Sequence, residues 1–531
     1  MFNKIYKLLK YFQLNSLNNY IHSPNISDTS KKNIPKSIVN IKKHLENVFS
    51  DCHDFVFREL TLGQNNEIKI AIAFIDGLVD KQILNRDILK PLMINSQDFN
   101  IHSFNNSLPD ILKDNILNNY NIKKVDSLDD TISFILSGES IIYIDGEKYA
   151  LIAETSNYEI RNVDEPDTEA VVRGPREGFV ESLKVNISLI RRKIKNPKLK
   201  VEKITLGKQT NTDVCICYIN GIVHQHVVET VKKRLSKINI DAILESGYIE
   251  EFIEDSPLSI FPTVGNSEKP DIVAAKVLEG RVAILCDGTP FVLTVPYLFV
   301  ETMQVSEDYY SRSIFTSAVR LLRVLSLFIS TSLPAYYVAL IAFHPSVIPF
   351  KLLLTISASR EGIPFSPFTE ALVMGIAFEL LREAGVRMPR PIGQAVSIVG
   401  ALVLGDAAVK AGLASTPMVI VTSITAITSF ILPPLGGALP LIRLMLLLGA
   451  NILGLLGILL VSIVIFIHAC SLYSFGVPYM SPLAPICGAD LKDTFVRLPL
   501  WLMFTRPKSL IKDNTNNINF VRKDDQYDNE K

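Results

Sequence analysis

The residues best placed to do chemistry lie in an apolar stretch of the C-terminal half, IGQAVSIVGALVLGDAAVKAG. At helical spacing, one face of this stretch carries three valines followed by an acid and a base. These residues are Val396, Val399, Val403, Asp406 and Lys410. Such a face is typical of a pore lining, in which a hydrophobic constriction gates by dewetting beside a charged mouth. The alternative is a helix packed inside a bundle, with Asp406 and Lys410 as an ordinary pair four residues apart.

Three further charges, Glu370, Glu379 and Arg382, lie in a second apolar segment. A charge isolated in lipid is costly, so such side chains are either paired or functional. The two glutamates are nine residues apart, half a turn out of phase, which predicts separate partners. Glu379 can pair with Arg382 or, across helices, with Arg320 or Arg323. A structural salt bridge and a role in ion passage both fit this pattern.

A third candidate lies in EPDTEAVVRGPREGFVESL, between the two halves of the N-terminal region. Gly174-Pro175 forbids a helix there and fixes a turn. Charges flank an aromatic side chain that we expect to be exposed. The motif consists of Arg173, Gly174, Pro175, Arg176, Glu177, Gly178 and Phe179. It is either an exposed linker or a docking strap in which Arg173, Arg176 and Phe179 contact a neighbouring lobe or subunit.

Signatures of catalysis are absent from the sequence. There is no Walker A loop, no GxGxxG behind a strand, and no HExxH or GxSxG motif. The 54 basic and 54 acidic residues cancel, which argues against a nucleic-acid partner. None of the six cysteines forms a CxxC pair, so we expect reduced packing residues and no metal site. We expect neither enzymatic activity nor a cofactor.

Charge divides the chain into two regions. Only 12 of the 166 residues from Val324 to Ala489 are charged, against 96 of the other 365. This contrast predicts a soluble region followed by a membrane domain. The N-terminus lacks the uninterrupted apolar core of a signal peptide, so we expect the soluble region in the cytoplasm.

The membrane region should contain about five hydrophobic helices. The expected segments are residues 324–343, 367–381, 392–409, 413–432 and a long helix from 440 to about 475. Arginines before the first segment and between the second and third predict cytoplasmic flanks. Five full crossings would leave the tail outside, whereas its own lysines and arginines favour the inside. A re-entrant segment or an interfacial return would remove this conflict, and we expect both ends to be cytoplasmic.

The soluble region contains an internal duplication. LSGESIIYIDGEKYALI, from Leu136, matches LEGRVAILCDGTPFVLT, from Leu278, at an offset of 142 residues. Asp-Gly between apolar runs indicates a β-hairpin in which both turn residues take positive φ. We therefore expect two related lobes, with hairpins turning at Asp145-Gly146 and Asp287-Gly288.

The predicted fold is a cytoplasmic α/β N-terminal module of two related lobes, followed by an all-α polytopic membrane domain. We expect a disordered N-terminus at residues 1–40 and a C-terminal tail at 477–531. Between them we expect a first lobe at 41–158, a linker at 159–183, a second lobe at 184–312 and the membrane domain at 313–476.

Several segments resemble the A subunit of GerA-type spore germinant receptors. The segments are EPDTEAVVRGPREGF, EGRVAILCDGTP with the YY that follows, LPAYYVALIAFHPSVIP, ELLREAGVRMPRPIGQAVSIVGALVLGDAAVKAGL and PYMSPLAPICG. The blocks RGPREGF and REAGVRMP are specific to that family. The resemblance covers about residues 160–510.

This resemblance implies a multi-pass protein of the endospore inner membrane. It implies homo-oligomers of A subunits forming a nutrient-gated cation channel, together with a transporter-like B subunit that binds the nutrient and a lipoprotein C subunit. A sporulation-stage paralogue that enhances germination, a membrane-anchored scaffold and a stand-alone secondary transporter are the alternatives. A transporter would usually carry inverted repeats in its membrane half, whereas the duplication here lies in the soluble half.

Overall fold

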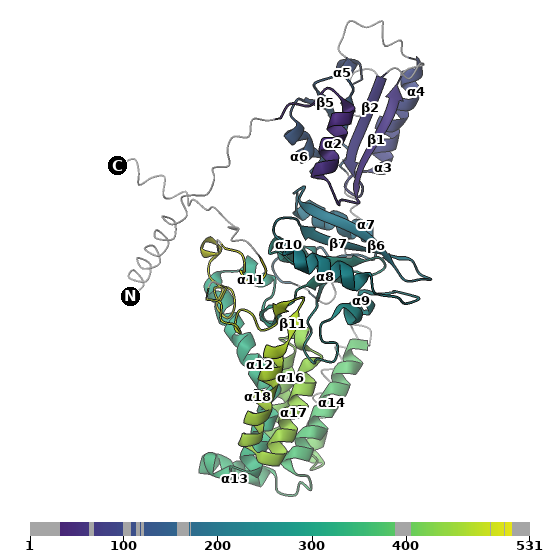
Figure 1. Ribbon diagram of the computed structural model, residues 1–531. Coiled ribbons are helices and arrows are strands. Elements are labelled where there is room, and N and C mark those ends of the chain that lie inside the picture. Colours follow the sequence, from purple (N-terminus) through teal and green to yellow (C-terminus); the bar gives the residue numbers. More distant parts are fainter. Residues whose placement is uncertain are drawn as a thin grey trace, which may run out of the picture. The chain divides into compact units, whose positions relative to one another are not determined.

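The structure, a computed structural model, describes residues 32–62, 68–98, 108–112, 117, 122–156, 169, 171–387, 405–488, 490–503 and 505–511. Most of the N-terminus expected to be disordered and the tail beyond residue 511 lie outside the described residues. The chain divides into two compact units, one of residues 1–50 and 54–159, the other of residues 51–53 and 160–531 (Figure 1).

Lobe 1, the folded part of the first unit, is an antiparallel sheet in the order β1-β2-β4-β5-β3. Its strands are β1 (Phe55–Leu62), β2 (Ile68–Ile75), β3 (Ile122–Val125), β4 (Ser140–Ile144) and β5 (Ala150–Ala153). Its helices are α2 (Ile38–Val48), α3 (Lys81–Ile83), the π-helix η1 (Leu84–Leu89), α4 (Lys90–Asp98), α5 (Leu108–Ile111) and α6 (Leu128–Leu136). The central strands read as continuous apolar runs because both of their faces are buried.

Lobe 2, in the second unit, repeats this order as β6-β7-β9-β10-β8. Its strands are β6 (Leu199–Leu206), β7 (Thr212–Ile219), β8 (Gly265–Ser267), β9 (Val282–Cys286) and β10 (Val292–Val295). Its helices are α7 (Leu183–Lys193), α8 (Gln225–Leu235), α9 (Ser246–Ile253) and α10 (Pro270–Leu278). The first two strands pair in the same register in both lobes, Phe57 with Ala73 and Val201 with Cys217.

Both predicted hairpins are confirmed, since β4 pairs with β5 and β9 with β10. Gly146 and Gly288 take φ values of +88° and +90°. The expectation that the aspartates also take positive φ is wrong, because each loop is longer than two residues and only its glycine needs that conformation. The two aspartates instead cap helices: Asp145 Oδ1 accepts from Ile38 N–H and Asp287 Oδ1 from Leu183 N–H, both at 3.0 Å.

A short extended segment covers the edge of the lobe 2 sheet. Cys52 forms a parallel bridge with Val201 of β6. The N–H of His53 donates to Val201 O at 2.9 Å, and the N–H of Val201 donates to Asp51 O at 3.2 Å. One residue of the lobe 2 edge strand, Val201, therefore bridges to residues 51–53 through its outward backbone groups.

The rest of the second unit is a helical bundle (Figure 1). Its helices are α12 (Ser313–Ala342), α13 (Phe350–Ser359), α14 (Pro367–Arg387), α16 (Thr416–Ser429), α17 (Ala438–Leu453) and α18 (Leu455–Ser471). Among the described residues, α12 alone is long and apolar enough to cross a membrane, while α13, α16, α17 and α18 are apolar but shorter. The sequence analysis did not predict α13.

The expected long helix from 440 to about 475 is wrong. Gly454, with φ of +61°, separates α17 from α18 and reverses the chain. The two helices touch at glycines, since a Cβ on Gly457 would lie 1.9 Å from Gly449 O. Small residues permit such close backbone contact between membrane helices.

This reversal returns the chain to the lobe 2 end of the bundle. At the end of α18, His468 Nε2 lies 3.0 Å from Ser259 Oγ of lobe 2. Beyond it, Arg497 N–H donates to Ser317 Oγ in the first turn of α12 at 3.1 Å. The start of α12 and the end of α18 therefore share one end of the bundle.

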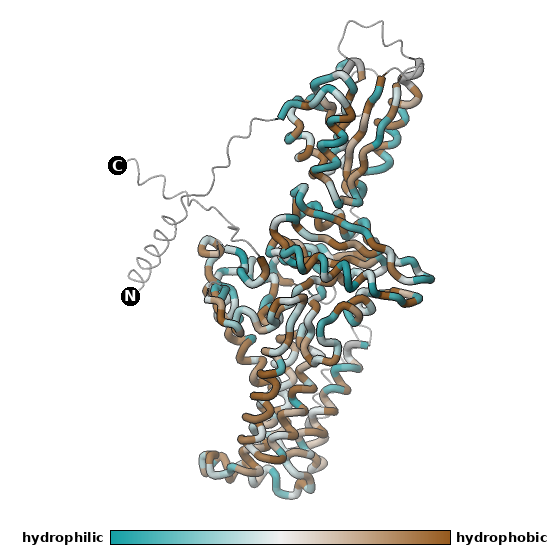
Figure 2. Tube along the Cα trace, viewed as in Figure 1, coloured by the Kyte–Doolittle hydropathy of each residue, from teal (hydrophilic) through white to brown (hydrophobic). Residues whose placement is uncertain are grey.

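Hydrophobic residues make up much of the bundle, whereas hydrophilic residues are more frequent along the lobes (Figure 2). Leu325, Phe328, Ile452 and Val464 are all more than half exposed. A surface of this kind is stable only against lipid or another apolar surface.

Candidate functional site

A short helix, α11 (Glu307–Tyr310), lies between lobe 2 and α12. It follows the 3-10 helix η4 (Phe299–Met303) and ends three residues before α12 begins. Each of its residues contacts a different part of the second unit. We call Glu307, Asp308, Tyr309 and Tyr310 the α11 joint.

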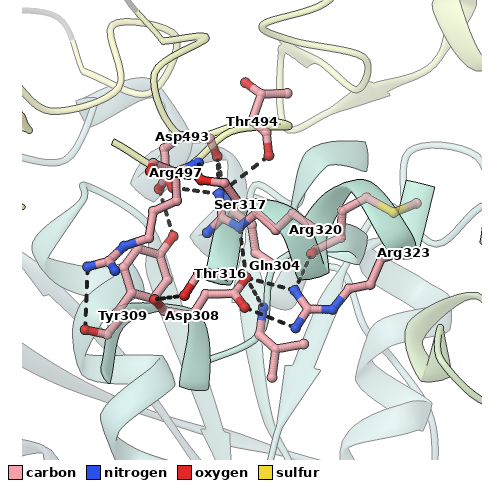
Figure 3. A network of polar contacts seen from close by, with 12 residues as sticks. Gln304, Asp308, Tyr309, Thr316, Ser317, Arg320, Arg323, Asp493, Thr494 and Arg497 are labelled. Atoms are coloured by element: carbon pink, nitrogen blue, oxygen red, sulfur yellow. Dashed lines mark hydrogen bonds and ion pairs between the residues drawn. The ribbon is translucent and has the colours of Figure 1, made fainter. Parts of the chain in front are cut away.

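Asp308 attaches α12 to the joint (Figure 3). Its carboxylate is 3% exposed and accepts from Arg320 Nε at 2.8 Å. Arg323 donates to it through both terminal nitrogens, at 2.7 and 2.9 Å, and also to Met303 O at 3.0 Å. A buried carboxylate with two guanidinium groups is stable only while all three charges are present.

Tyr309 attaches the C-terminal segment (Figure 3). Its hydroxyl donates to Asp493 Oδ2 at 2.7 Å, while Arg320 donates to Asp493 Oδ1 at 2.7 Å. The guanidinium groups of Arg320 and Arg497 each lie 5.6 Å from the Tyr309 ring. Burial, with the nearby Asp493 carboxylate, raises the pKa of Tyr309 well above its usual value. The hydroxyl therefore stays protonated and remains a donor.

Tyr310 and Glu307 attach lobe 2. The Tyr310 hydroxyl donates to Asp271 Oδ2 of α10 at 2.6 Å. Glu307 Oε1 accepts from the backbone N–H of Arg173 at 3.1 Å and from that of Val172. The motif RGPREGF thus rests on the joint through its backbone.

Gly174 allows this contact, because it has a positive φ of +149° and packs against Tyr310. A Cβ on Gly174 would lie 2.9 Å from the Tyr310 ring. Arg173 and Arg176 are exposed, whereas Glu177 pairs with Arg192 and Lys193 at 3.2 and 3.3 Å.

The expectation that Phe179 is exposed is wrong. Phe179 is 6% exposed and packs in the core of lobe 2. Its N–H donates to Glu268 O at 2.7 Å, which draws the strap against the lobe just before α7 begins. Phe179 therefore anchors the motif to its own lobe, whereas Arg173 and Arg176 are exposed.

A buried carboxylate also fixes η4, which leads into the joint. Glu301 lies 3.1 Å from both Lys276 and Arg281, and it accepts from Leu298 N–H at 2.8 Å. Burial alone would raise the pKa of Glu301, but Arg281 and Lys276 hold it below its usual value. The charge therefore persists within lobe 2 and fixes the start of the joint.

A second connection runs through the β11–β12 hairpin (Tyr473–Ser474 and Val477–Pro478), which follows α18. Phe475 at its tip is 1% exposed and belongs to the core of lobe 2. Its N–H donates to Asp255 Oδ2 at 2.6 Å, and the Arg234 guanidinium lies 4.5 Å from its ring. Phe475 also has a φ of +49°, a conformation that costs about 1–3 kcal/mol and that its burial and contacts must offset.

The glutamates of α14 have separate partners, as their spacing predicts. Glu370 accepts from the N–H and hydroxyl of Ser415, and its other oxygen lies 3.5 Å from Arg360. Glu379 lies 2.7 Å from Arg382 and 3.3 Å from Arg443. Neither Arg320 nor Arg323 pairs with Glu379, because Asp308 binds both.

Of the predicted pore face, Val396, Val399 and Val403 lie outside the described residues. Asp406 and Lys410 lie on one helical turn and form an ion pair at 2.6 Å. Their side chains are 59% and 75% exposed. They precede the connection to α16, where a Cβ on Gly412 would be 3.9 Å from Gly362 O.

A family model described as the Bacillus/Clostridium GerA spore germination protein matches residues 43–509. The chain belongs to the GerA family. Spore germination protein KA of Bacillus subtilis (strain 168) is 46% identical over 483 residues, which are 91% of this chain and 87% of that protein. Spore germination protein GerLA of Bacillus cereus is 36% identical over 482 residues, 90% of this chain and 97% of that protein.

Among solved structures, the N-terminal domain of the A subunit of the Bacillus megaterium spore germinant receptor GerK3 is 34% identical. The matched region covers 51% of this chain and 98% of that domain, with a TM-score of 0.39. The family predicted from the sequence is thus confirmed, and with it a role in spore germination and a membrane location. The names of these GerA relatives describe germination proteins and not enzymes, which is consistent with the absence of catalytic motifs.

The sequence analysis missed the joint of this GerA protein. It used the two tyrosines only as part of a resemblance, and it treated Arg320 and Arg323 as flanking charges and as possible partners of Glu379. A usable signal was present: EDYY directly precedes a membrane helix with two arginines in its first three turns. Such arginines need carboxylate partners, and Asp308 is close in sequence.

Proposed function

We propose that this GerA-family chain is the A subunit of a nutrient receptor in the endospore inner membrane. Several copies assemble around an axis into a cation channel, and opening of the channel triggers germination. A transporter-like B subunit and a lipoprotein C subunit complete the receptor. The chain itself uses no cofactor.

The exposed Asp406–Lys410 pair carries this proposal. An ion pair on the outside of an apolar bundle needs water or a polar partner, because lipid solvates neither charge. One bundle of short helices has too little polar surface to enclose a water-filled path. Several copies, each contributing the face of Val396, Val399, Val403, Asp406 and Lys410, would supply a hydrophobic gate with a charged mouth.

The reversal at Gly454 supports a topology with both ends in the cytoplasm. The single helix expected after residue 440 becomes two, α17 and α18, which adds one crossing. An even number of crossings places the tail on the side of lobe 2, as its basic residues favour. The chain would then be a multi-pass protein with its lobes in the cytoplasm.

The two connections to lobe 2 suggest how a signal reaches the path. The α11 joint attaches the start of α12, and Phe475 attaches the end of α18. A movement of lobe 2 would therefore move both helices. Because α12 packs along α16 and α17, the displacement would spread through the bundle.

The experiment is nutrient-triggered ion release from spores at matched protein levels. Val403→Ala should let water into the gate, so that spores form poorly or germinate without nutrient. Asp406→Asn should mainly slow the cation flow. The control is Val464→Ala, which shortens an exposed valine on the outside of α18. A Val403→Ala strain that accumulates normally and stays dormant, like the control, would contradict this face as the gate.

A further inference from the structure

Lobe 1 carries an open groove between its edge strand β1 and the helix formed by η1 and α4. The groove has a volume of about 560 Å³. Arg58, Arg86 and Lys90 supply cations, and Leu89, Met93 and Ile94 supply apolar surface. Met93 and Ile94 are 52% and 53% exposed, so the apolar wall faces solvent.

The backbone of β1 forms the other element of this site. Among the described residues β1 pairs only with β2, which leaves its outer edge open. The shared register makes Phe57 the counterpart of Val201, whose outward N–H and C=O bind residues 51–53 in lobe 2. The outward groups of Phe57 therefore face the same way, and an added strand can bind them as residues 51–53 bridge to Val201 in lobe 2.

The charges of the groove define what such a strand must carry. Arg86 is already paired, since its Nε lies 2.7 Å from Asp87 Oδ1. Across the described ranges, Arg58 and Lys90 have no carboxylate partner. These two cations therefore favour a ligand that carries carboxylates. The apolar residues Leu89, Met93 and Ile94 favour an extended chain that also carries apolar side chains.

The helix that lines the groove also differs between the two lobes. Residues Leu84–Leu89 form a π-helix, whereas the matching helix of lobe 2, α8, is α-helical over Gln225–Leu235. A π-helical turn widens the helix and is frequent at functional sites. The distortion lies at the groove wall and in the lobe whose edge is open.

We infer that lobe 1 binds an extended acidic segment of a partner protein, which adds as a strand to β1. On the face of the strand that turns toward the groove, its carboxylates meet Arg58 and Lys90 and its apolar side chains pack on Leu89, Met93 and Ile94. Backbone hydrogen bonds to Phe57 supply affinity, and the cations select acidic sequences. This surface is distinct from the channel face and from the α11 joint.

The test uses the full chain in lipid nanodiscs and a fluorescent peptide six residues long, in which glutamate and valine alternate along one strand face and threonine fills the other positions. Binding is measured by fluorescence anisotropy. Arg58→Glu with Lys90→Glu should weaken binding about tenfold or more, since two ion pairs are lost. Lys43→Glu, an equal charge change on exposed α2, should leave the affinity unchanged. The milder Arg58→Gln with Lys90→Gln variant, checked for an unchanged unfolding midpoint, should give an intermediate loss.

Two control peptides separate strand addition from simple charge attraction. An alternating lysine and valine peptide should not bind. An acidic peptide with proline at alternate positions, which lacks the N–H groups of a strand, should bind at least about tenfold more weakly. Any of three results would overturn the inference. These are equal binding of the proline peptide, an unchanged affinity in the double variants, and no binding by the wild-type chain because a second copy covers β1.

Discussion

Lobe 1 and lobe 2 share a strand order and a set of turns, yet their cores and their contacts with the rest of the chain differ. The core of lobe 1 is built from residues of that lobe alone, between Leu62 and Ala153. The core of lobe 2 contains Phe475, from a hairpin almost two hundred residues beyond its last strand. Lobe 2 alone also contacts the α11 joint, through Asp271. The duplication therefore supplied two scaffolds, and residues outside the repeat attached one of them to the membrane helices.

The edge strands differ in the same way. Residues 51–53 cover β6, whereas β1 pairs only with β2 within the described part of lobe 1. A sheet edge that is left open is available for binding. Lobe 2 is thus attached to the helices of the bundle, whereas the described part of lobe 1 leaves the outer edge of β1 open.

Removal of Asp308 should break the attachment of lobe 2 most severely. Asp308→Ala leaves the buried Arg323 without its carboxylate partner and removes one of the two carboxylate partners of Arg320, so we expect a loss of about 3–5 kcal/mol. The measurement is the unfolding midpoint in nanodiscs, together with the protein level in spore membranes. The matched control is Asp126→Ala, an exposed aspartate of lobe 1. Equal midpoints for the two variants would contradict a structural role for the joint.

Truncation of Phe475 should free the hairpin with a loss of stability of similar size. Replacement of a buried phenylalanine by alanine costs about 3–5 kcal/mol of stability. Alanine at position 475 would still need the positive φ, so the substitution relieves no backbone strain. Hydrogen exchange of residues 472–480 should accelerate in Phe475→Ala and stay unchanged in Tyr473→Ala, which truncates an exposed neighbour. Protection that persists in both variants would show that other contacts hold the hairpin.

The shared turns should respond alike in both lobes. Asp145→Ala and Asp287→Ala each remove a carboxylate that caps a helix, so each should cost about 1 kcal/mol. The measurement is local hydrogen exchange of α2 and α7 in the full chain. If one variant has an effect several times that of the other, the two turns are not structurally equivalent.

The smallest effect concerns pH and lobe 2. Burial, with the nearby Glu254 and Glu245 carboxylates, raises the pKa of Glu250 from 4.5 to about 7. The folded state thus keeps a proton that the unfolded state loses, so this contribution to stability is complete below about pH 4.5 and is lost as pH rises through about 7. Because the side chain is only partly buried, we expect the difference to stay below about 1 kcal/mol.

Glu250→Gln should remove this part of the pH dependence, while Glu251→Gln, at an exposed neighbour, should preserve it. The unfolding midpoint of lobe 2 measured between pH 5 and 8 gives the answer. If the wild-type midpoint instead rises with pH over this range and Glu250→Gln removes the rise, the pKa of Glu250 is lowered and not raised, which would contradict its buried environment.

Local patterns in the sequence predicted the repeat well. The two Asp-Gly pairs located both hairpins, since a turn between apolar runs depends on neighbouring residues alone. The α17–α18 break was missed although Gly454 lies at its centre, because a glycine within an apolar run also fits a continuous helix. Its effect depends on the contact of Gly449 with Gly457, which only the packed helices reveal.

The functional residues were harder to predict, for a related reason. Glu370 and Glu379 stood out because a charge in an apolar segment is conspicuous. Asp308 and Asp493 lie in ordinary polar sequence, and they become notable only when the fold brings both into contact with Arg320. Phe179 and Phe475 likewise show their roles only once the core of lobe 2 is assembled.

The most direct test of the central claim, that lobe 2 acts on the membrane helices through the α11 joint, is ion release from spores carrying Tyr310→Phe. This change removes the hydrogen bond to Asp271 and leaves the ring in place against Gly174. At matched protein levels, with the nutrient mixture that germinates the parent spores, we predict a several-fold slower release. Tyr336→Phe, a half-exposed tyrosine of α12, should release ions at the parental rate. A Tyr310→Phe strain that also releases ions at the parental rate would contradict the account.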